Sequence, residues 1–138
     1  MNNLPKNFFK KCESLTSITL PNTTLSIGDY AFSGCASLKE ANIGTGVKFI
    51  GLSAFANNAQ LTSIDRLNDN DGSHTFDIVC DYAFAGTGLK KAKLSLRSSA
   101  IYTFWGDGCF QDCKDLIEVN VLSANYLSKD MFKDCISL

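Results

Sequence analysis

Phenylalanine recurs at a near-constant interval along the whole chain of 138 residues, and this recurrence constrains the fold more than any other feature. Successive members of the set lie between 22 and 29 residues apart. The set comprises Phe9, Phe32, Phe55, Phe84, Phe110 and Phe132. A fixed period of about 20 to 50 residues is the signature of a repeat architecture. We therefore expect a solenoid, in which each copy is one coil and neighbouring coils share a continuous core.

Apolar residues also recur at fixed distances from these anchor phenylalanines. Six, nine and eleven residues after the anchor, three copies carry Leu15, Ile18 and Leu20; Leu38, Ala41 and Ile43; and Leu116, Val119 and Val121. Alternation of apolar and polar residues near the end of these segments predicts a short β-strand. The Phe55 copy departs with Arg66 at the third position, and the Phe84 copy is one residue short. Stacked coils would place consecutive strands in parallel, about 4.8 Å apart.

The residues before each anchor complete the expected core. The fifth residue before the anchor and the residue just before it are apolar in every copy: Leu4, Ile27, Ile50, Val79, Trp105 and Leu127, with Phe8, Ala31, Ala54, Ala83, Cys109 and Met131. The segment 28–35 is too short for a stable helix, so it predicts one helical or 3₁₀ turn that places Phe32 in the core. The predicted fold class is α/β, with short parallel strands on one face and single helical or 3₁₀ turns on the other.

Several stretches of this pattern resemble a known family, the BspA-like leucine-rich repeat. They are LTSITLP (15–21), IGDYAFSGCASL (27–38), FIGLSAFANNAQLTSI (49–64) and VCDYAFAGTGLKKAKL (79–94). The resemblance implies a right-handed leucine-rich repeat solenoid, usually part of a larger cell-surface or secreted protein used in adhesion and protein binding. We expect residues 1–138 to form a single domain of about five to six repeats, with an insertion at 65–77. Because both ends stop partway through a repeat, the chain is expected to be a fragment of a longer array.

Charge and hydropathy exclude some classes of partner. Lys and Arg number 13 against 14 Asp and Glu, so no basic excess is available to bind the phosphates of a nucleic acid. No run of about 18 apolar residues predicts membrane insertion. The opening MNNLPKNFFKKC has no signal peptide pattern. The family resemblance favours the cell surface or secretion, whereas the missing signal and the unpaired thiols leave the cytoplasm open.

Four of the six cysteines share one position, three residues after an anchor. They are Cys12, Cys35, Cys113 and Cys135, and the other two copies have Asn58 and Thr87 there. This column predicts small buried side chains whose thiols remain free and can donate to a neighbouring carbonyl. A disulfide between Cys12 and Cys35 is the main alternative. A structural zinc site is less favoured, because no CxxC pair exists.

The chain offers little for catalysis or for binding a cofactor. The one histidine, His74, lies in the polar insertion with no evident nucleophile beside it. With Gly72 at the sixth position of an EF-hand loop, Asp69 and Asp71 would fit as calcium ligands, but Leu67 and Ile78 replace two essential ones. We therefore predict no catalytic residue, no metal and no cofactor, and keep a calcium site of another kind open as an alternative for the 65–77 insertion.

The polar residues that alternate with the strand core form the expected binding face. They are Ser17 and Thr19, Glu40 and Asn42, Ser63 and Asp65, Lys91 and Lys93, and Glu118 and Asn120. The charges could simply pair across adjacent strands, Lys91 with Glu118 and Lys93 with Asp65. We predict a non-enzymatic module that binds a protein or glycan, within an adhesin-like surface protein. The alternatives are a structural or self-assembling spacer, which associates through uncapped ends, and an intracellular scaffold.

Overall fold

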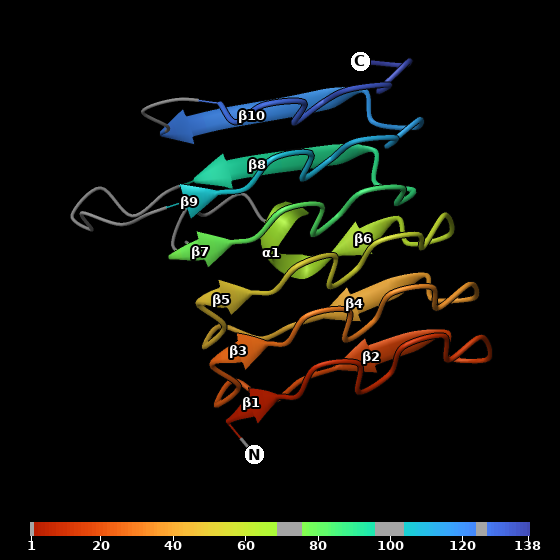
Figure 1. The fold of residues 1–138 in the computed structure, drawn as a ribbon, viewed down its shortest axis with the longest axis vertical. Helices are drawn as coiled ribbons and strands as arrows, with labels where there is room; N and C mark the ends of the chain where they lie inside the picture. The colour runs from red at the N-terminus through yellow and green to blue at the C-terminus, as the bar shows by residue number, and fades with distance from the viewer. Residues whose placement is uncertain (1, 69–75, 96–103, 124–126) are drawn as a thin grey trace.

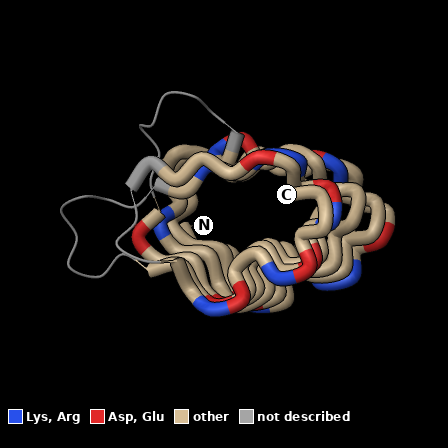
Figure 2. Tube along the Cα trace, turned by 90° about the horizontal axis from the view of Figure 1, so that it is seen from above, with Lys and Arg blue, Asp and Glu red and all other residues tan. Residues whose placement is uncertain are grey.

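The structure is a computed structural model and describes residues 2–68, 76–95, 104–123 and 127–138. In this part the chain winds into coils stacked one above the next, with the N-terminus at one end of the stack and the C-terminus at the other (Figure 1). We number the coils 1 to 6 by their anchors, Phe9, Phe32, Phe55, Phe84, Phe110 and Phe132. Seen along the stack, each coil is a flattened ring, and charged residues of both signs are spread around it (Figure 2).

Two columns of short parallel strands run along the stack. One column is a five-stranded sheet of β1 (Asn3–Leu4), β3 (Ser26–Ile27), β5 (Phe49–Ile50), β7 (Ile78–Val79) and β9 (Phe104–Trp105). The other contains β2 (Ser17–Thr19), β4 (Glu40–Asn42) and β6 (Ser63–Ile64), then the short helix α1 (Asp65–Asn68), then β8 (Lys91–Ser95) and β10 (Glu118–Ser123). Strands of the two columns run in opposite directions, because the chain reverses within each coil (Figure 1).

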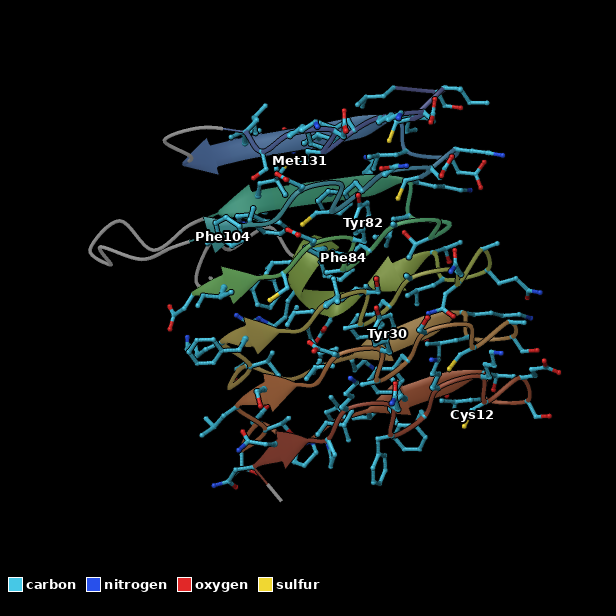
Figure 3. All side chains as sticks on the ribbon, viewed as in Figure 1. Cys12, Tyr30, Tyr82, Phe84, Phe104 and Met131 are labelled. Carbon is cyan, nitrogen blue, oxygen red and sulfur yellow. The ribbon has the colours of Figure 1, made fainter. Side chains whose placement is uncertain are left out.

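The anchor phenylalanines form one continuous stack of rings through the core. Neighbouring ring centroids lie 5.0 to 5.8 Å apart and the rings are within 15° of parallel. Phe32, Phe55, Phe84 and Phe110 are fully buried, and Figure 3 places Phe84 within the stack of coils. Offset-stacked aromatic pairs contribute about 0.5–1.5 kcal/mol each beyond the burial of their area. The period of phenylalanine in the sequence is therefore the period of the coil.

A turn with two left-handed residues surrounds each anchor. In coil 2 these are Tyr30 (φ 57°) and Gly34 (φ 71°), two residues before and two after Phe32. The N–H groups of Tyr30, Phe32 and Gly34 donate to carbonyl oxygens of the next coil at 2.7 to 2.9 Å. The same three bonds recur at every junction from coil 1 to coil 6. Left-handed backbone is strained for residues other than glycine, and these bonds offset that strain. The turn is where we predicted it, but its left-handed residues prevent a continuous helical turn.

The cysteine column lies inside the solenoid, and its thiols bond the coils together. All six cysteines are free, so Cys12 and Cys35 do not form the alternative disulfide. The Sγ atoms of Cys113 and Cys135 donate to the anchor carbonyl of the preceding coil at 3.2 and 3.0 Å. Asn58, in the same column, donates to the carbonyls of both Phe32 and Phe55, at 2.8 and 2.9 Å. The predicted role, a small buried donor at a turn, is confirmed by these contacts.

Arg66 explains why the second strand column is interrupted after β6. Its side chain is 3% exposed, although an arginine stands where other copies have a strand residue of the core. The guanidinium donates to the carbonyls of Gly44 and Val47 at 3.2 and 2.6 Å and lies 4.4 Å from the centre of the Phe76 ring. The chain turns into α1 at this point. A buried cation thus occupies the position where the sequence pattern breaks.

The predicted parallel-strand solenoid is confirmed. The column of Leu4, Ile27, Ile50, Val79 and Trp105 is buried as expected, and the structure adds that these residues end the strands of a second sheet. Three predicted core positions toward the ends of the stack are wrong: Phe8 is 49% exposed, Val121 47% exposed and Leu127 53% exposed. Phe8 and Leu127 lie in terminal coils, and Val121 lies on β10, the last described strand of its column, so each has a described neighbour on one side only.

Candidate functional site

The ten residues predicted as a binding face, here called the polar strand face, fall into two groups. On one side, Ser17, Glu40 and Ser63 occupy successive rungs of β2, β4 and β6, and Thr19 pairs with Asn42. On the other side, Lys91 lies opposite Glu118, and Lys93 lies opposite Asn120. Asp65 lies in α1. The structure therefore aligns the residues within each group, but α1 lies between the groups.

Polar groups on this face bond to one another. The Nζ of Lys91 lies 3.1 Å from Oε2 of Glu118. The side-chain amides of Asn42 and Asn120 donate to the carboxylates of Glu40 and Glu118 at 3.4 and 3.2 Å. The expected charge pairing between Lys91 and Glu118 is therefore present. An exposed ion pair of this kind contributes little to stability.

Asp65 was expected on the exposed sheet face, and this expectation is wrong. The residue begins α1 and is half-buried. Its Oδ1 accepts the N–H of Ile43 at 3.0 Å and the N–H of Arg66 at 2.9 Å. A carboxylate at the start of a helix accepts N–H groups that have no partner within the helix. Asp65 therefore stabilises the start of α1, where the strand column is interrupted, and its Oδ1 already accepts two hydrogen bonds.

A row of apolar side chains on the five-stranded sheet was not among the predicted site residues. Phe49, Ile78 and Phe104 are in register on β5, β7 and β9. Phe49 and Phe104 are 45% and 40% exposed, and Leu25, beside β3, is 46% exposed. We call these four residues the apolar stripe, and Figure 3 shows Phe104 at its upper end. The signal was available in the sequence, because the sixth residue before the anchor is apolar in three consecutive copies.

A polar hollow lies at the end of the flattened coils away from the apolar stripe, where the turn of coil 4 is one residue short. Its volume is about 500 Å³. Coil 3 provides one side, coil 4 the floor and coil 5 the other side. The lining residues are Asn57, Ala59, Gly86, Thr87, Asp112, Lys114 and Asp115. We call this site the coil-4 hollow.

The buried thiols are poor nucleophiles. Burial raises the pKa of the Cys109 thiol to about 12 and that of Cys113 to about 11. Burial also raises the pKa of Cys35, Cys80 and Cys135. The thiolate is the reactive form of cysteine, so these side chains stay protonated near neutral pH and remain hydrogen-bond donors.

Other hypotheses drawn from the sequence concern residues that the structure does not describe. Asp69, Asp71, Gly72 and His74 lie outside them, and so does the calcium site considered for the insertion. Within the described ranges, no group of three or more His, Cys, Asp or Glu side chains is arranged to hold a metal ion. No helix among the described residues is long and apolar enough to cross a membrane.

Three solved structures resemble this fold. The T. pallidum leucine rich repeat protein has a TM-score of 0.50 and 17% identity, over 88% of this chain and 77% of that one. A leucine rich cell surface protein from Faecalibacterium prausnitzii has a TM-score of 0.48 and 21% identity, over 80% of this chain and 33% of that one. A leucine-rich repeat protein from Bacteroides ovatus has a TM-score of 0.34 and 18% identity, over 99% and 62%. This chain thus spans about a third of the Faecalibacterium protein.

The family of this chain is assigned from its amino-acid sequence. No curated protein sequence matches the chain at a significant level. Residues 2–138, however, match the family described as the BspA type leucine rich repeat region (6 copies). The spacing of the anchors, the stacked coils and this match agree along nearly the whole chain. The chain therefore belongs to the BspA-type leucine-rich repeat family.

Proposed function

We propose that the protein is a non-enzymatic interaction module of a cell-surface or secreted adhesin-like protein, and that it binds a protein or glycan partner on its outward faces. The observation that carries this proposal is the apolar stripe. Phe49, Ile78 and Phe104 repeat in register on adjacent strands, and both phenylalanines remain substantially exposed. Contiguous exposed apolar side chains mark interaction surfaces, because a soluble surface otherwise keeps such patches small.

The polar strand face complements the stripe. Lys91 already pairs with Glu118. Glu118 and Glu40 also accept hydrogen bonds from the amides of Asn120 and Asn42. Breaking these bonds to bind a partner would offset part of the gain, so this face would supply selectivity more than affinity. Reversing the charge of both Lys91 and Lys93 tests this role. Partner binding should weaken, and unchanged binding would remove the polar strand face from the proposal.

Site-specific photo-cross-linking tests the proposed function even while the partner is unidentified. A benzophenone amino acid would replace Phe104 on the stripe or Asn120 on the polar strand face, with a control at the exposed Glu13 of coil 1. The purified variants would be irradiated on intact source cells and their extracellular matrix. We expect discrete adducts from position 104, suppressed by excess unlabelled chain. Adducts equal to those of the Glu13 control at both positions would contradict the proposal.

The compartment and the competing function need separate measurements. Surface-shaved and cytosolic fractions of the source cells should differ, with peptides of this chain in the shaved fraction. Detection only in the cytosol would favour the intracellular scaffold.

A self-assembling spacer is the other candidate, favoured by the exposed Phe8 in coil 1 and Ile136 in coil 6. Sedimentation velocity over a wide range of concentration would reveal it as a growing oligomer.

A further inference from the structure

The shortened turn of coil 4 removes side chains from the surface between coils 3 and 5. Coil 2 has Cys35-Ala36-Ser37 before its strand leucine, whereas coil 4 has only Thr87-Gly88. The N–H of Gly88 donates to the carbonyl of Asn58 in coil 3, and a Cβ at Gly88 would collide with the carbonyl oxygen of Ala59. The turn of coil 4 is thus drawn against coil 3.

The same shortening changes the hydrogen bonding of the turn. In every other coil, the N–H of the strand leucine donates to the carbonyl three residues earlier, as Leu38 does to Cys35 at 3.0 Å. Leu89 of coil 4 makes no such bond to the described backbone. The turn that normally projects two side chains outward is therefore absent in this coil. The space left by those side chains is the coil-4 hollow.

Polar side chains around the hollow have no partners among the described residues. Asn57 stands on one side, and Asp112, Lys114 and Asp115 stand on the other. None of the four makes a side-chain hydrogen bond or an ion pair with another described residue. The polar strand face differs, because its charges and amides pair internally. The polar groups of the hollow are therefore available to a ligand without the loss of an internal bond.

We propose that the coil-4 hollow binds a neutral sugar residue of a glycan. Sugar hydroxyls can donate to the carboxylates of Asp112 and Asp115 and accept from the ammonium of Lys114, while the amide of Asn57 can do both. Gly86 contributes only backbone to the floor, and Asn57 lies where a Cβ of residue 86 would point, with its Oδ1 3.1 Å from that position. The volume of about 500 Å³ falls within the range of about 300–1,000 Å³ typical of small-molecule sites.

The charge of the lining selects among sugars. Two carboxylates and one ammonium leave one net negative charge, which disfavours phosphate, sulfate and acidic sugars. The hydroxyl of Thr87 forms part of the floor, but it already donates to the carbonyl of Phe84 at 2.9 Å. Recognition thus depends on the four exposed polar side chains. This inference rests on the proposed function, since it names a ligand class and a place for one of its partners.

The first experiment probes the intact chain, labelled at its N-terminus, on an array of oligosaccharides. Neutral hexose and N-acetylhexosamine termini form the test set, and sialylated and sulfated termini form the acidic set. The strongest neutral oligosaccharide is then titrated in solution. We expect saturable binding, with ¹⁵N chemical shift changes centred on Gly86, Thr87 and Asp112. Binding confined to the acidic set, or no binding in either set, would overturn the inference.

Two variants of different design test the location of the site. Asp112→Asn combined with Asp115→Asn removes the carboxylates, and binding should weaken about tenfold or more, the effect of losing one charge-assisted hydrogen bond. Replacing Gly88 with the Ala-Ser of coil 2 restores the usual turn length and should fill the hollow. Asp134→Asn, at the equivalent position of coil 6, is the matched control and should bind as the unaltered chain does.

The outcomes separate this inference from the proposed function. Equal affinity of the double asparagine variant and the unaltered chain would overturn the sugar site, whether or not the lengthened variant folds. Direct binding of polylysine without any binding of neutral sugars would identify a site for basic peptides instead and would also overturn it. Persistent photo-cross-links from position 104 in either case would leave the interaction module intact. Absence of both signals would contradict both proposals.

Discussion

The Sγ of Cys35 donates a hydrogen bond to the carbonyl oxygen of Phe9, one coil earlier, at 3.1 Å. The same link joins Cys113 to Phe84 and Cys135 to Phe110. These cysteines and Asn58 thus fasten their own coils to the backbone of the coil before, whereas Thr87 donates to the carbonyl of Phe84 within its own coil. A thiol is a weak donor, so the column adds many small contributions in place of one strong one. Asn58, with two amide bonds, is the strongest member of this column.

Asn58→Ala should destabilise the protein by about 2–4 kcal/mol, because it leaves two buried carbonyls without their donor. Asn58→Cys should lose less, since cysteine is the residue that most coils carry at this position. Urea unfolding followed by circular dichroism measures both changes. Asn42→Ala, on the exposed strand face, is the control and should change stability by less than about 0.5 kcal/mol. Equal losses in all three variants would contradict the role of the column.

Phe55→Ala should cost about 3–5 kcal/mol, because Phe55 is fully buried and stacks between two other rings. Phe9→Ala should cost much less. Phe9 is half-buried and lies at the end of the ring stack. Thermal unfolding of the two variants under the same conditions gives the comparison. A similar shift in Tm for both would show that position in the stack does not determine the contribution of a ring.

Stability should fall steeply at alkaline pH, in part because of Cys109. The thiol ionises near pH 9 in the unfolded chain but only near a pKa of about 12 in the folded protein. The unfolded state therefore loses its proton first as pH rises, and the stability present below pH 9 is progressively lost. Between pH 9 and 10.5 this group alone accounts for about 2 kcal/mol.

Cys109→Ala isolates that contribution, and alanine occupies the same position in coils 2, 3 and 4. Urea unfolding at pH 8 and pH 10.5 should give a smaller pH dependence for the variant than for the unaltered chain. The two proteins differ only at this side chain, so a difference in their pH dependence belongs to the thiol. Parallel pH dependences would refute the assignment.

Arg66→Lys should destabilise the protein by about 2–3 kcal/mol although the charge is retained. The planar guanidinium bonds two carbonyls and stacks on Phe76, and an ammonium cannot reproduce that arrangement. Hydrogen exchange should accelerate around Val47, whose carbonyl loses its donor. A Lys39→Arg variant on the exposed surface provides the reverse exchange as a control. Unchanged protection near Val47 would argue against this role.

The sequence predicts the core better than the surface. Phe anchors and their apolar companions repeat with the coil, so spacing alone assigns them to the interior. The left-handed turns could not be foreseen in the same way. Tyr30, Tyr82 and Lys11 are not residues that favour this backbone, and the hydrogen bonds of the neighbouring coil impose it on them. Local preference is overridden there by stacking.

Departures from the repeat were visible in the sequence, but their meaning was not. Arg66 and the short turn before Leu89 each break the pattern by one residue. The first becomes a buried cation that redirects the chain into α1, and the second opens a hollow between coils. Both results depend on contacts with the coils on either side. Spacing marks such positions without revealing the space around them.

The hydrogen bonds of the anchor turns give the solenoid a dipole along its long axis. At each junction three N–H groups point toward the following coil and meet carbonyls that point back, so their peptide dipoles add along the stack. The resulting field is positive at the coil 6 end and negative at the coil 1 end. Lys10 and Lys11 flank the carbonyls at the negative end, whereas at the positive end Asp130 and Asp134 alternate with Lys129 and Lys133. The basic residues at the negative end match the charge that stabilises the C-terminal end of an α-helix, although the described residues contain only one short helix.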